Sequence, residues 1–227
     1  MIKSIIFDLC GPIITLDLEL MNNRFRSYGV TAVEKPYQRL RDEGLTKRFE
    51  QGVVSESDFC DEVRQILQCN LTDEEIFDCW NTVVSDFPPH HAETLSKLSS
   101  RYRLFLLSNS DVVNAKLFHD YVNQHAGEGF MERTFAKEFF SCDLKLRKPA
   151  PEIFATILES CSLQPSETLF VDDCLKHTQS AASLGISVIW LKPEWDIADL
   201  FDDNLEVLPF FCKRRTYKNT KNKVGLS

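Results

Sequence analysis

The stretch Ile5-Ile6-Phe7-Asp8-Leu9-Cys10-Gly11-Pro12 determines the fold that we expect for this chain. The apolar residues before Asp8 are typical of a buried strand, and Gly11-Pro12 turns the chain soon after it. Open α/β sheets hold their chemistry at the carboxyl ends of their strands. We therefore expect Asp8 to be a functional carboxylate, with Cys10 as an unusual neighbour.

The carboxyl-terminal half alternates short apolar runs with helical periodicity. This pattern predicts repeated βα units around a mostly parallel sheet, which is a doubly wound, Rossmann-like α/β fold. Strands are predicted at residues 4–8, 103–107, 139–142, 169–172 and 187–191. Helices are predicted near residues 112–122, 151–160 and 175–184.

Residues from about 18 to 86 have helical spacing and no convincing strand. Ser55-x-x-Asp58 and Thr72-x-x-Glu75 both have the sequence of a helix-capping box. Pro88-Pro89 marks the return of the chain to the sheet. We expect a core at 1–16 and 87–205 with an inserted α-helical cap at 17–86 that covers the site as a lid. The alternative is an independent helical bundle that does not contact the site.

The last segment, 206–227, is predicted to be a basic, flexible tail. From residue 212 onward it has six basic residues and no acidic one. A basic arm for nucleic acid or anionic lipid is the alternative to a frayed, solvated end.

The bulk composition excludes several classes of protein. The 227 residues carry a net charge of -8, which argues against a nucleic-acid partner. No run of about 18 apolar residues occurs, so we expect no membrane span, and a signal peptide is not expected. The eight cysteines, without a Cys-x-x-Cys pair, are typical of buried reduced thiols rather than of a disulfide framework, which predicts a cytoplasmic protein.

Polar residues follow three further predicted strands. Ser108-Asn109 ends one of them and precedes a helix whose first-turn amide groups we expect to be free for an anionic oxygen. Arg147-Lys148-Pro149 follows another, and Asp172-Asp173 ends a third. Adjacent carboxylates repel each other, and a hard cation would relieve that repulsion.

These four segments together resemble the sequence motifs of the haloacid dehalogenase-like hydrolase superfamily, over roughly residues 1–200. In detail the chain is similar to the branch of sugar-1-phosphate phosphatases, particularly the alpha-D-glucose-1-phosphate phosphatases. The resemblance implies that Asp8 is the nucleophile and becomes an aspartyl-phosphate. It implies that Ser108 and the Asn109 backbone bind the phosphate, and that Lys148 neutralises charge on both Asp8 and the phosphate.

The resemblance also implies a Mg2+ ion. Its ligands would be Asp8, the Cys10 backbone carbonyl and Asp173, with Asp172 as a direct or water-mediated ligand. The expected substrate is a small phosphate ester, a sugar phosphate such as a hexose 1-phosphate. The sequence gives no indication of the oligomeric state.

Two residues depart from the family pattern. Cys10 occupies the position of the aspartate that protonates the leaving group and later activates water, and a thiol is a poor substitute for that acid. The site should therefore favour leaving groups that need little help, such as the hemiacetal oxygen of a sugar 1-phosphate. His177 replaces the usual Asn or Asp near the metal loop and is expected either to form a hydrogen bond there or to be a surface histidine.

Two other functions use the same scaffold. A 2-haloacid dehalogenase also lacks the second acid. It needs no metal, however, so the adjacent carboxylates Asp172-Asp173 count against this function. A catalytically weak binding protein would explain Cys10 alone. A separate hypothesis is that oxidation or a soft metal acts on Cys10 and Cys174, which both adjoin proposed metal-site residues.

Overall fold

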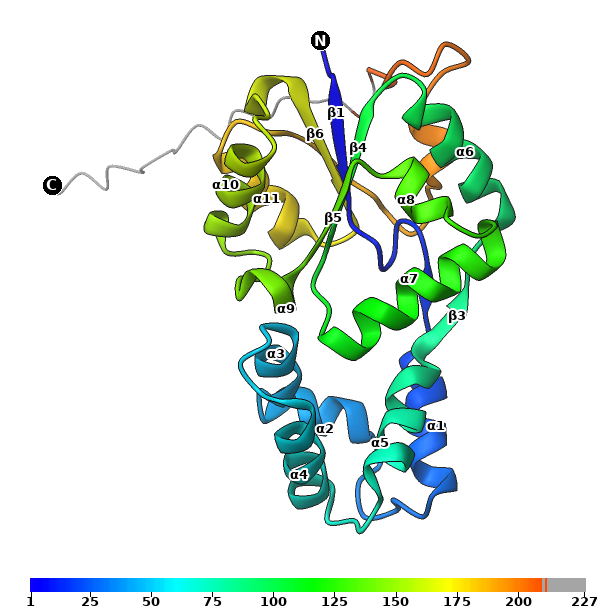
Figure 1. The fold of residues 1–227 in the computed structure, drawn as a ribbon, viewed down its shortest axis with the longest axis vertical. Coiled ribbons are helices and arrows are strands. Elements are labelled where there is room, and N and C mark those ends of the chain that lie inside the picture. The colour runs from blue at the N-terminus through cyan, green and yellow to red at the C-terminus, as the bar shows by residue number, and fades with distance from the viewer. Residues whose placement is uncertain (210, 212–227) are drawn as a thin grey trace, which may run out of the picture.

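The computed structural model describes residues 1–209 and 211 and contains a five-stranded parallel sheet. The central strand pairs with neighbours on both sides, and most of the apolar residues that predicted the strands are buried. Figure 1 shows the sheet in the upper part of the molecule. The strands lie in the order β5 (Lys137–Phe140), β4 (Arg103–Ser108), β1 (Ser4–Phe7), β6 (Thr168–Asp172) and β7 (Ser187–Trp190).

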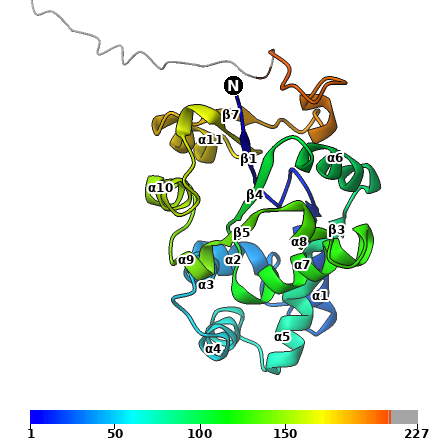
Figure 2. The same cartoon turned by 45° about the horizontal axis from the view of Figure 1, so that its top comes forward.

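Helices cover both faces of the sheet (Figure 2). Successive strand residues point to opposite faces, so Ile5 and Phe7 belong to one hydrophobic cluster while Ile6 belongs to another. The first face is covered by α6 (Pro89–Ser99), α7 (Val112–Ala126), α8 (Phe130–Thr134) and the short helix η3 (Ile197–Leu200). The second is covered by α10 (Pro151–Ser160) and α11 (Leu175–Ser183). The chain therefore has the doubly wound α/β fold that the sequence predicts.

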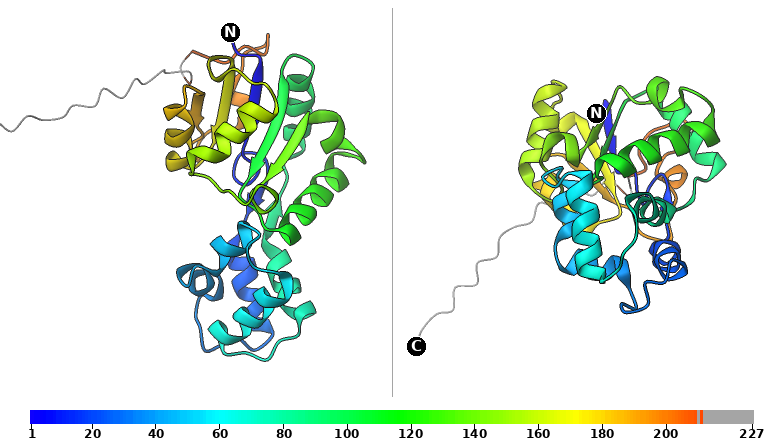
Figure 3. Two further views of the ribbon diagram at one scale, coloured as in Figure 1. Left: turned by 60° about the vertical axis from the view of Figure 1, so that its left-hand side comes forward. Right: turned by 60° about the horizontal axis from the view of Figure 1, so that its bottom comes forward.

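The helices of the segment 17–86 form a separate group beyond the carboxyl edge of the sheet (Figures 1 and 3). Ser55 and Thr72 cap their helices as predicted, and Thr72 forms a full capping box with Glu75. The helices are α1 (Leu18–Ser27), α2 (Pro36–Asp42), α3 (Leu45–Glu50), α4 (Glu56–Leu67), α5 (Asp73–Trp80) and the short η1 (Asn81–Val83).

The two ends of this segment are joined by a short antiparallel ribbon that the sequence did not predict. It pairs β2 (Thr15–Leu16) with β3 (Val84–Asp86), next to the loop that follows β1. Because both connections run through this ribbon, the helical group enters and leaves the core at one place.

Several boundaries differ from the predicted ones. The strand predicted at 139–142 lies at Lys137–Phe140, because Ser141–Leu144 forms the short helix α9. At the other end of the core, η2 (Pro165–Glu167) precedes β6. The other strands and helices predicted in the core agree with the structure to within four residues at each end, whereas α6 and α8 were not predicted.

Ordered contacts continue beyond residue 205. Val207 bridges Phe201, and Glu206 forms an ion pair with Arg101. The basic residues of the predicted tail lie outside the described part of the chain. Among the described residues, the structure has no helix with the length and apolar character needed to cross a bilayer.

Candidate active site

The structure brings four of the predicted site residues together at the carboxyl edge of the sheet. Asp8 directly follows β1, Ser108 ends β4 and Asp172 ends β6, and all three are buried. Lys148 comes from the loop between α9 and α10 and has no exposed surface. Because β1 pairs with both β4 and β6, the three strand ends are neighbours.

The Lys148 ammonium group is fully occupied by acceptors. Its Nζ lies 2.8 Å from Asp8 Oδ1, 2.8 Å from Asp172 Oδ2 and 2.9 Å from the Leu107 carbonyl oxygen. An ammonium group has three protons, and three acceptors surround it. A buried charge needs such partners, so this arrangement fixes Lys148 beside Asp8.

The two carboxylates around Lys148 have different acidities. Burial raises the pKa of Asp8 well above its usual value, and the charge of Asp172 adds to the rise although Lys148 opposes it. Burial also acts to raise the pKa of Asp172, but Lys148 and His177 outweigh it and lower that pKa below its usual value. Asp172 is therefore the permanent partner of Lys148, while a further cation would stabilise the ionised form of Asp8.

A divalent cation fits the carboxylates at this edge. Oxygens of Asp8, Asp172 and Asp173 lie within 4.8 Å of one another. Burial and the charge of Asp172 raise the pKa of Asp173. Three carboxylates beside one ammonium group carry excess negative charge, and an all-oxygen set suits Mg2+. The residues that would hold the ion are Asp8, Asp173 and the Cys10 carbonyl, as the family resemblance implies.

Gly11 is a part of this site that sequence analysis treated only as a turn. Its φ is +102°, which favours glycine, and an added Cβ would lie 2.5 Å from Asp173 Oδ2. The loop after β1 therefore packs directly against Asp173, the proposed metal ligand. A side chain at position 11 would prevent this close approach. A glycine three residues after the proposed nucleophile was the available signal.

Asn109 positions Lys148 through two hydrogen bonds. The Lys148 amide donates to Asn109 Oδ1 at 2.8 Å, and Asn109 Nδ2 donates to the Lys148 carbonyl at 3.0 Å. The Asn109 side chain is thus committed to the lysine loop, and only its backbone stays available for the predicted phosphate contact. The Ser108 hydroxyl lies 2.7 Å from that of Ser110, which sequence analysis did not identify.

The expectation of free amide groups at the start of α7 was wrong. Asp111 caps this helix, and its Oδ1 accepts hydrogen bonds from the amides of Val113 and Asn114 at 3.0 and 2.9 Å. Asp111 itself is buried, and burial raises its pKa. A carboxylate of the chain itself therefore already engages these two amides.

His177 is part of the site rather than a surface histidine. Its Nδ1 lies 2.9 Å from Asp172 Oδ2 and 3.1 Å from Oδ1, and the Cys174 amide donates to Oδ1 at 2.7 Å. Together with Lys148, these contacts commit both oxygens of Asp172 to protein partners. Asp172 therefore orients Lys148 and has little freedom to bind an ion directly.

The Cys10 thiol is only partly exposed at this edge. Burial raises its pKa well above the usual value, and the neighbouring charge of Asp8 raises it further. The thiol therefore stays protonated at neutral pH. It cannot serve as the carboxylate base that the family pattern places there.

The helical segment contacts the core next to these residues. Glu50, at the end of α3, pairs with Arg147, with Oε2 2.5 Å from Nη2 and 3.0 Å from Nε. Its carbonyl also accepts from Ser141 Oγ at 2.6 Å. A second contact joins Trp80 Nε1 to Asp111 Oδ2 at 3.0 Å. Sequence analysis missed these pairs because their partners are 31 to 97 residues apart.

A family model described as haloacid dehalogenase-like hydrolase matches residues 2–185. The chain belongs to the haloacid dehalogenase-like hydrolase family. A D-ribitol-5-phosphate phosphatase from Bacteroides thetaiotaomicron is 27% identical over 197 residues, covering 86% of this chain and 93% of the relative. A crystal structure of a haloacid dehalogenase family enzyme from the same species, with magnesium and inorganic phosphate, is 30% identical. It has a TM-score of 0.78 and covers 89% of this chain and 100% of that one.

A more distant structure resembles this haloacid dehalogenase-like hydrolase in its fold. The L-2-haloacid dehalogenase from Xanthobacter autotrophicus is 20% identical, with a TM-score of 0.60, and covers 96% of this chain and 91% of its own. The comparisons confirm the predicted superfamily and hydrolase class, and the magnesium complex agrees with the predicted cofactor. The relative named for ribitol 5-phosphate does not extend the resemblance to the glucose-1-phosphate branch.

Proposed function

We propose that this hydrolase is a Mg2+-dependent phosphatase of a small sugar or sugar-alcohol phosphate, acting through an aspartyl-phosphate at Asp8. The observation that carries the proposal is the buried Lys148 ammonium between Asp8 and Asp172. Phosphoryl transfer needs positioning and positive charge more than covalent machinery. The relative named for D-ribitol 5-phosphate and the structure with magnesium and phosphate support the same reaction class.

In the first step, Asp8 attacks phosphorus. Lys148 and the Leu9 amide both contact Oδ1, at 2.8 and 2.7 Å, so Oδ2 is the oxygen that forms the new O–P bond. The P–O bond to the sugar breaks, and its electrons go to the leaving oxygen. The Ser108 hydroxyl would donate to a phosphoryl oxygen, and the Lys148 ammonium, held at Asp8 Oδ1, would stabilise the phosphoryl charge through its own charge. Mg2+, when bound, would supply Lewis-acid stabilisation of that charge.

In the second step, water attacks the aspartyl-phosphate and releases inorganic phosphate and free Asp8. A carboxylate two residues after the nucleophile would take the proton of this water, and Cys10 cannot. We therefore expect hydrolysis of the intermediate to limit turnover, with the water proton passing to solvent.

Cys10 also affects which substrates the site can hydrolyse. Without a general acid, the site expels an alkoxide slowly, whereas the hemiacetal oxygen of a sugar 1-phosphate leaves more easily. Cys10 thus favours the hexose 1-phosphate that the resemblance implies. Ribitol 5-phosphate is a primary alkyl phosphate, and its preference over hexose 1-phosphate would mean that the leaving group obtains its proton elsewhere.

We assign the segment 17–86 the role of a cap over this site. Its contacts to Arg147 and Asp111 favour a lid over an independent bundle, because both partners adjoin site residues. Tyr37 on α2 is partly buried here, and its removal from solvent together with the charge of Glu50 raises the pKa of Tyr37 to about 12. A neutral tyrosine hydroxyl is a suitable group for contacting sugar hydroxyls.

The test is phosphate release from hexose 1-phosphates, ribitol 5-phosphate and an aryl phosphate, with and without Mg2+, for the native chain and for Asp8→Asn. We expect Mg2+-dependent release that Asp8→Asn abolishes. The exposed Asp203→Asn is the matched control and should retain full activity.

The competing functions give different results in the same assay. Halide release from a 2-haloacid without metal would establish the dehalogenase in place of the phosphatase. Binding of phosphate esters without any turnover would establish the binding protein. Full phosphatase activity in Asp8→Asn would refute Asp8 as the nucleophile.

A further inference from the structure

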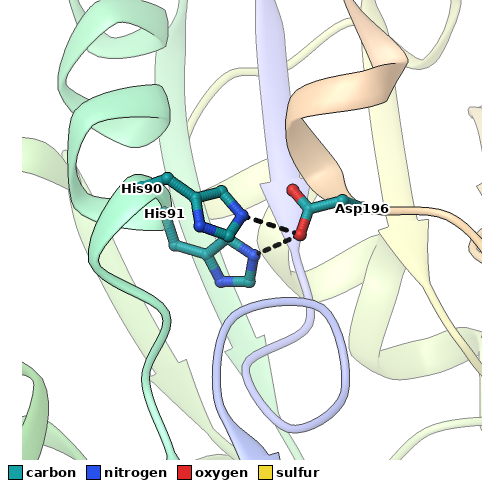
Figure 4. A group of neighbouring side chains, drawn as sticks. All are labelled: His90, His91 and Asp196. Carbon is teal, nitrogen blue, oxygen red and sulfur yellow. Dashed lines mark hydrogen bonds and ion pairs between the residues drawn. The ribbon is translucent and has the colours of Figure 1, made fainter.

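A second cluster of chemically capable side chains lies outside the candidate active site. His90 and His91 are in the first turn of α6, and Asp196 immediately precedes η3. Both Nε2 atoms lie 2.9 Å from the same oxygen, Asp196 Oδ2 (Figure 4). The ring planes of the histidines cross at 73°, so each ring approaches the carboxylate from its own direction.

The hydrogen bond on the far side of the His91 ring determines its protonation. Its Nδ1 lies 2.9 Å from the Ile13 carbonyl oxygen, and the side chain is only 7% exposed. A carbonyl can only accept, so Nδ1 must carry the proton. Nε2 of a neutral ring then directs its lone pair at a carboxylate oxygen 2.9 Å away. Two acceptors at that distance require either a second ring proton or a cation.

The Asp196 carboxylate is oriented in advance toward the two rings. Its Oδ1 accepts from the Ala198 amide at 2.8 Å, and the Asp196 amide donates to Asp199 Oδ2 at 3.1 Å. This capping box leaves Oδ2 for the two imidazoles. The other ring N–H of a metal-binding histidine characteristically donates to a carboxylate, a water or a backbone carbonyl, as His91 Nδ1–H does to the Ile13 carbonyl oxygen.

We propose that His90, His91 and Asp196 form a binding site for a zinc-like divalent transition-metal ion, distinct from the Mg2+ site. The ligand atoms all lie within 4.8 Å of one another. Two imidazole nitrogens and one carboxylate oxygen suit zinc, whereas Mg2+ prefers an all-oxygen set. Tetrahedral bonds of about 2.0–2.1 Å place ligand atoms about 3.3 Å apart, so small side-chain shifts from 2.9 Å are sufficient. His90 is half exposed, which leaves a fourth position open to water.

The site would connect three separate parts of the core. It links the start of α6 to η3, and through the His91–Ile13 hydrogen bond it reaches the loop between β1 and β2. An ion that binds only the folded chain stabilises it by mass action. We therefore expect zinc to raise the melting temperature independently of catalysis.

The test is competition titration of the metal-free full chain with Zn2+ against a chromophoric chelator, in excess Mg2+ to fill the carboxylate site. We expect one tight equivalent and a higher melting temperature for the native chain. Both should be lost in His90→Gln, with affinity reduced by more than about tenfold, since even outer-shell changes cost about 10–100-fold in metal affinity. Asp196→Asn should behave like His90→Gln.

Two controls locate the ion. Another cluster, Asp172, Cys174 and His177, could also bind zinc, so His177→Gln should retain the tight equivalent. The exposed His125→Gln should be silent. Co2+ substitution adds a spectroscopic readout, because the proposed site has no thiolate and should give no sulfur-to-metal charge-transfer band.

The contrary results are clear. Equal Zn2+ affinity in His90→Gln and the native chain would overturn the proposal, as would loss of the ion in His177→Gln alone. Absence of tight Zn2+ binding in the native chain would also overturn it. Because about half of the His90 side chain is exposed, its substitution should leave the fold intact.

Discussion

Arg147 and Lys148 are adjacent cations that belong to two different regions. Lys148 points into the sheet edge, is fully buried and pairs with two strand-end carboxylates. Arg147 points to the helical cap and pairs with one glutamate, Glu50, while about a quarter of its side chain stays exposed. The first contact is fixed by the register of three paired strands, and the second depends on two long side chains. We therefore expect the position of Lys148 to be rigid and the position of the cap relative to the core to be adjustable.

The largest effect should come from Lys148→Met. It leaves Asp8 and Asp172 buried without their common cation, which costs about 3–5 kcal/mol of folding free energy. Loss of one charge-stabilising donor also lowers turnover by about 10²–10³-fold. Chemical unfolding and phosphate release measure the two effects, and the exposed Lys176→Met is the control. Near-native turnover in a folded Lys148→Met would contradict the assigned role.

Cys10→Asp should change the kinetics in the opposite direction. If the missing acid limits the rate, turnover of alkyl phosphates rises by up to about 10²–10⁴-fold, the usual contribution of a general acid–base. With a hexose 1-phosphate, the native chain should also show a burst of sugar release followed by slow phosphate release. This burst should disappear in Cys10→Asp. Cys10→Ser, similar in size without the acid, is the control. An unchanged or lower rate in Cys10→Asp would show that the thiol is not limiting.

A smaller effect is expected where the cap meets the core. Arg147→Met and Glu50→Gln should each change KM more than kcat, because the pair adjoins the site without touching the reacting atoms. Burial raises the pKa of Glu50 even though Arg147 opposes it, so the pair is only partly compensated. A double-mutant cycle should give a coupling energy of about 0.5–3 kcal/mol. Strict additivity would show that the ion pair does not stabilise the closed cap.

The smallest effect should come from His119 on α7, which is partly exposed and pairs with Glu132 and Glu138. Burial acts to lower its pKa, but Glu138 and Glu132 outweigh it and raise the pKa above the usual value near 6.5. Its stabilisation is complete below pH of about 6.5 and is lost as pH rises through the raised folded-state pKa.

His119→Gln should therefore flatten the pH dependence of the free energy of unfolding above pH of about 6.5. The change should stay under about 1 kcal/mol, because solvent screens such a pair. Denaturant midpoints measured across this range provide the test, with His125→Gln as control. A native profile in His119→Gln would assign the dependence to another group.

The two regions also differ in how well the sequence predicts them. Most of the sheet edge was predictable because Asp8, Ser108 and Asp172 each follow an apolar run, and parallel strands bring such ends together. The strand near Phe139 was placed two residues late, because an edge strand with Lys137 and Glu138 lacks the apolar pattern of a central one. The ribbon of β2 and β3 was missed because two or three residues have no measurable periodicity.

The contacts of the cap could not be derived from sequence. Nothing local links Glu50 to Arg147 or Trp80 to Asp111, since these pairs depend on how the helical group folds onto the core. The Asp111 cap of α7 is different, because Asp before an apolar run is a recognisable capping signal. It was overlooked in favour of a phosphate-binding helix start, and its neighbour Ser110 was overlooked with it.

The central position of β1 in the sheet affects how fast its backbone amides exchange with solvent. Its backbone amides are engaged between β4 and β6, and the amide of Asp8 itself donates to the Val171 carbonyl at 2.9 Å. Amides held in this way exchange with solvent only when the whole domain unfolds. In a deuterium-exchange experiment, the segment that carries the proposed nucleophile should be among the last to acquire label, while the helices of the cap exchange through local opening. The proposed nucleophile is thus attached to the strand that we expect to open last, whereas the proposed cap should open locally and more often.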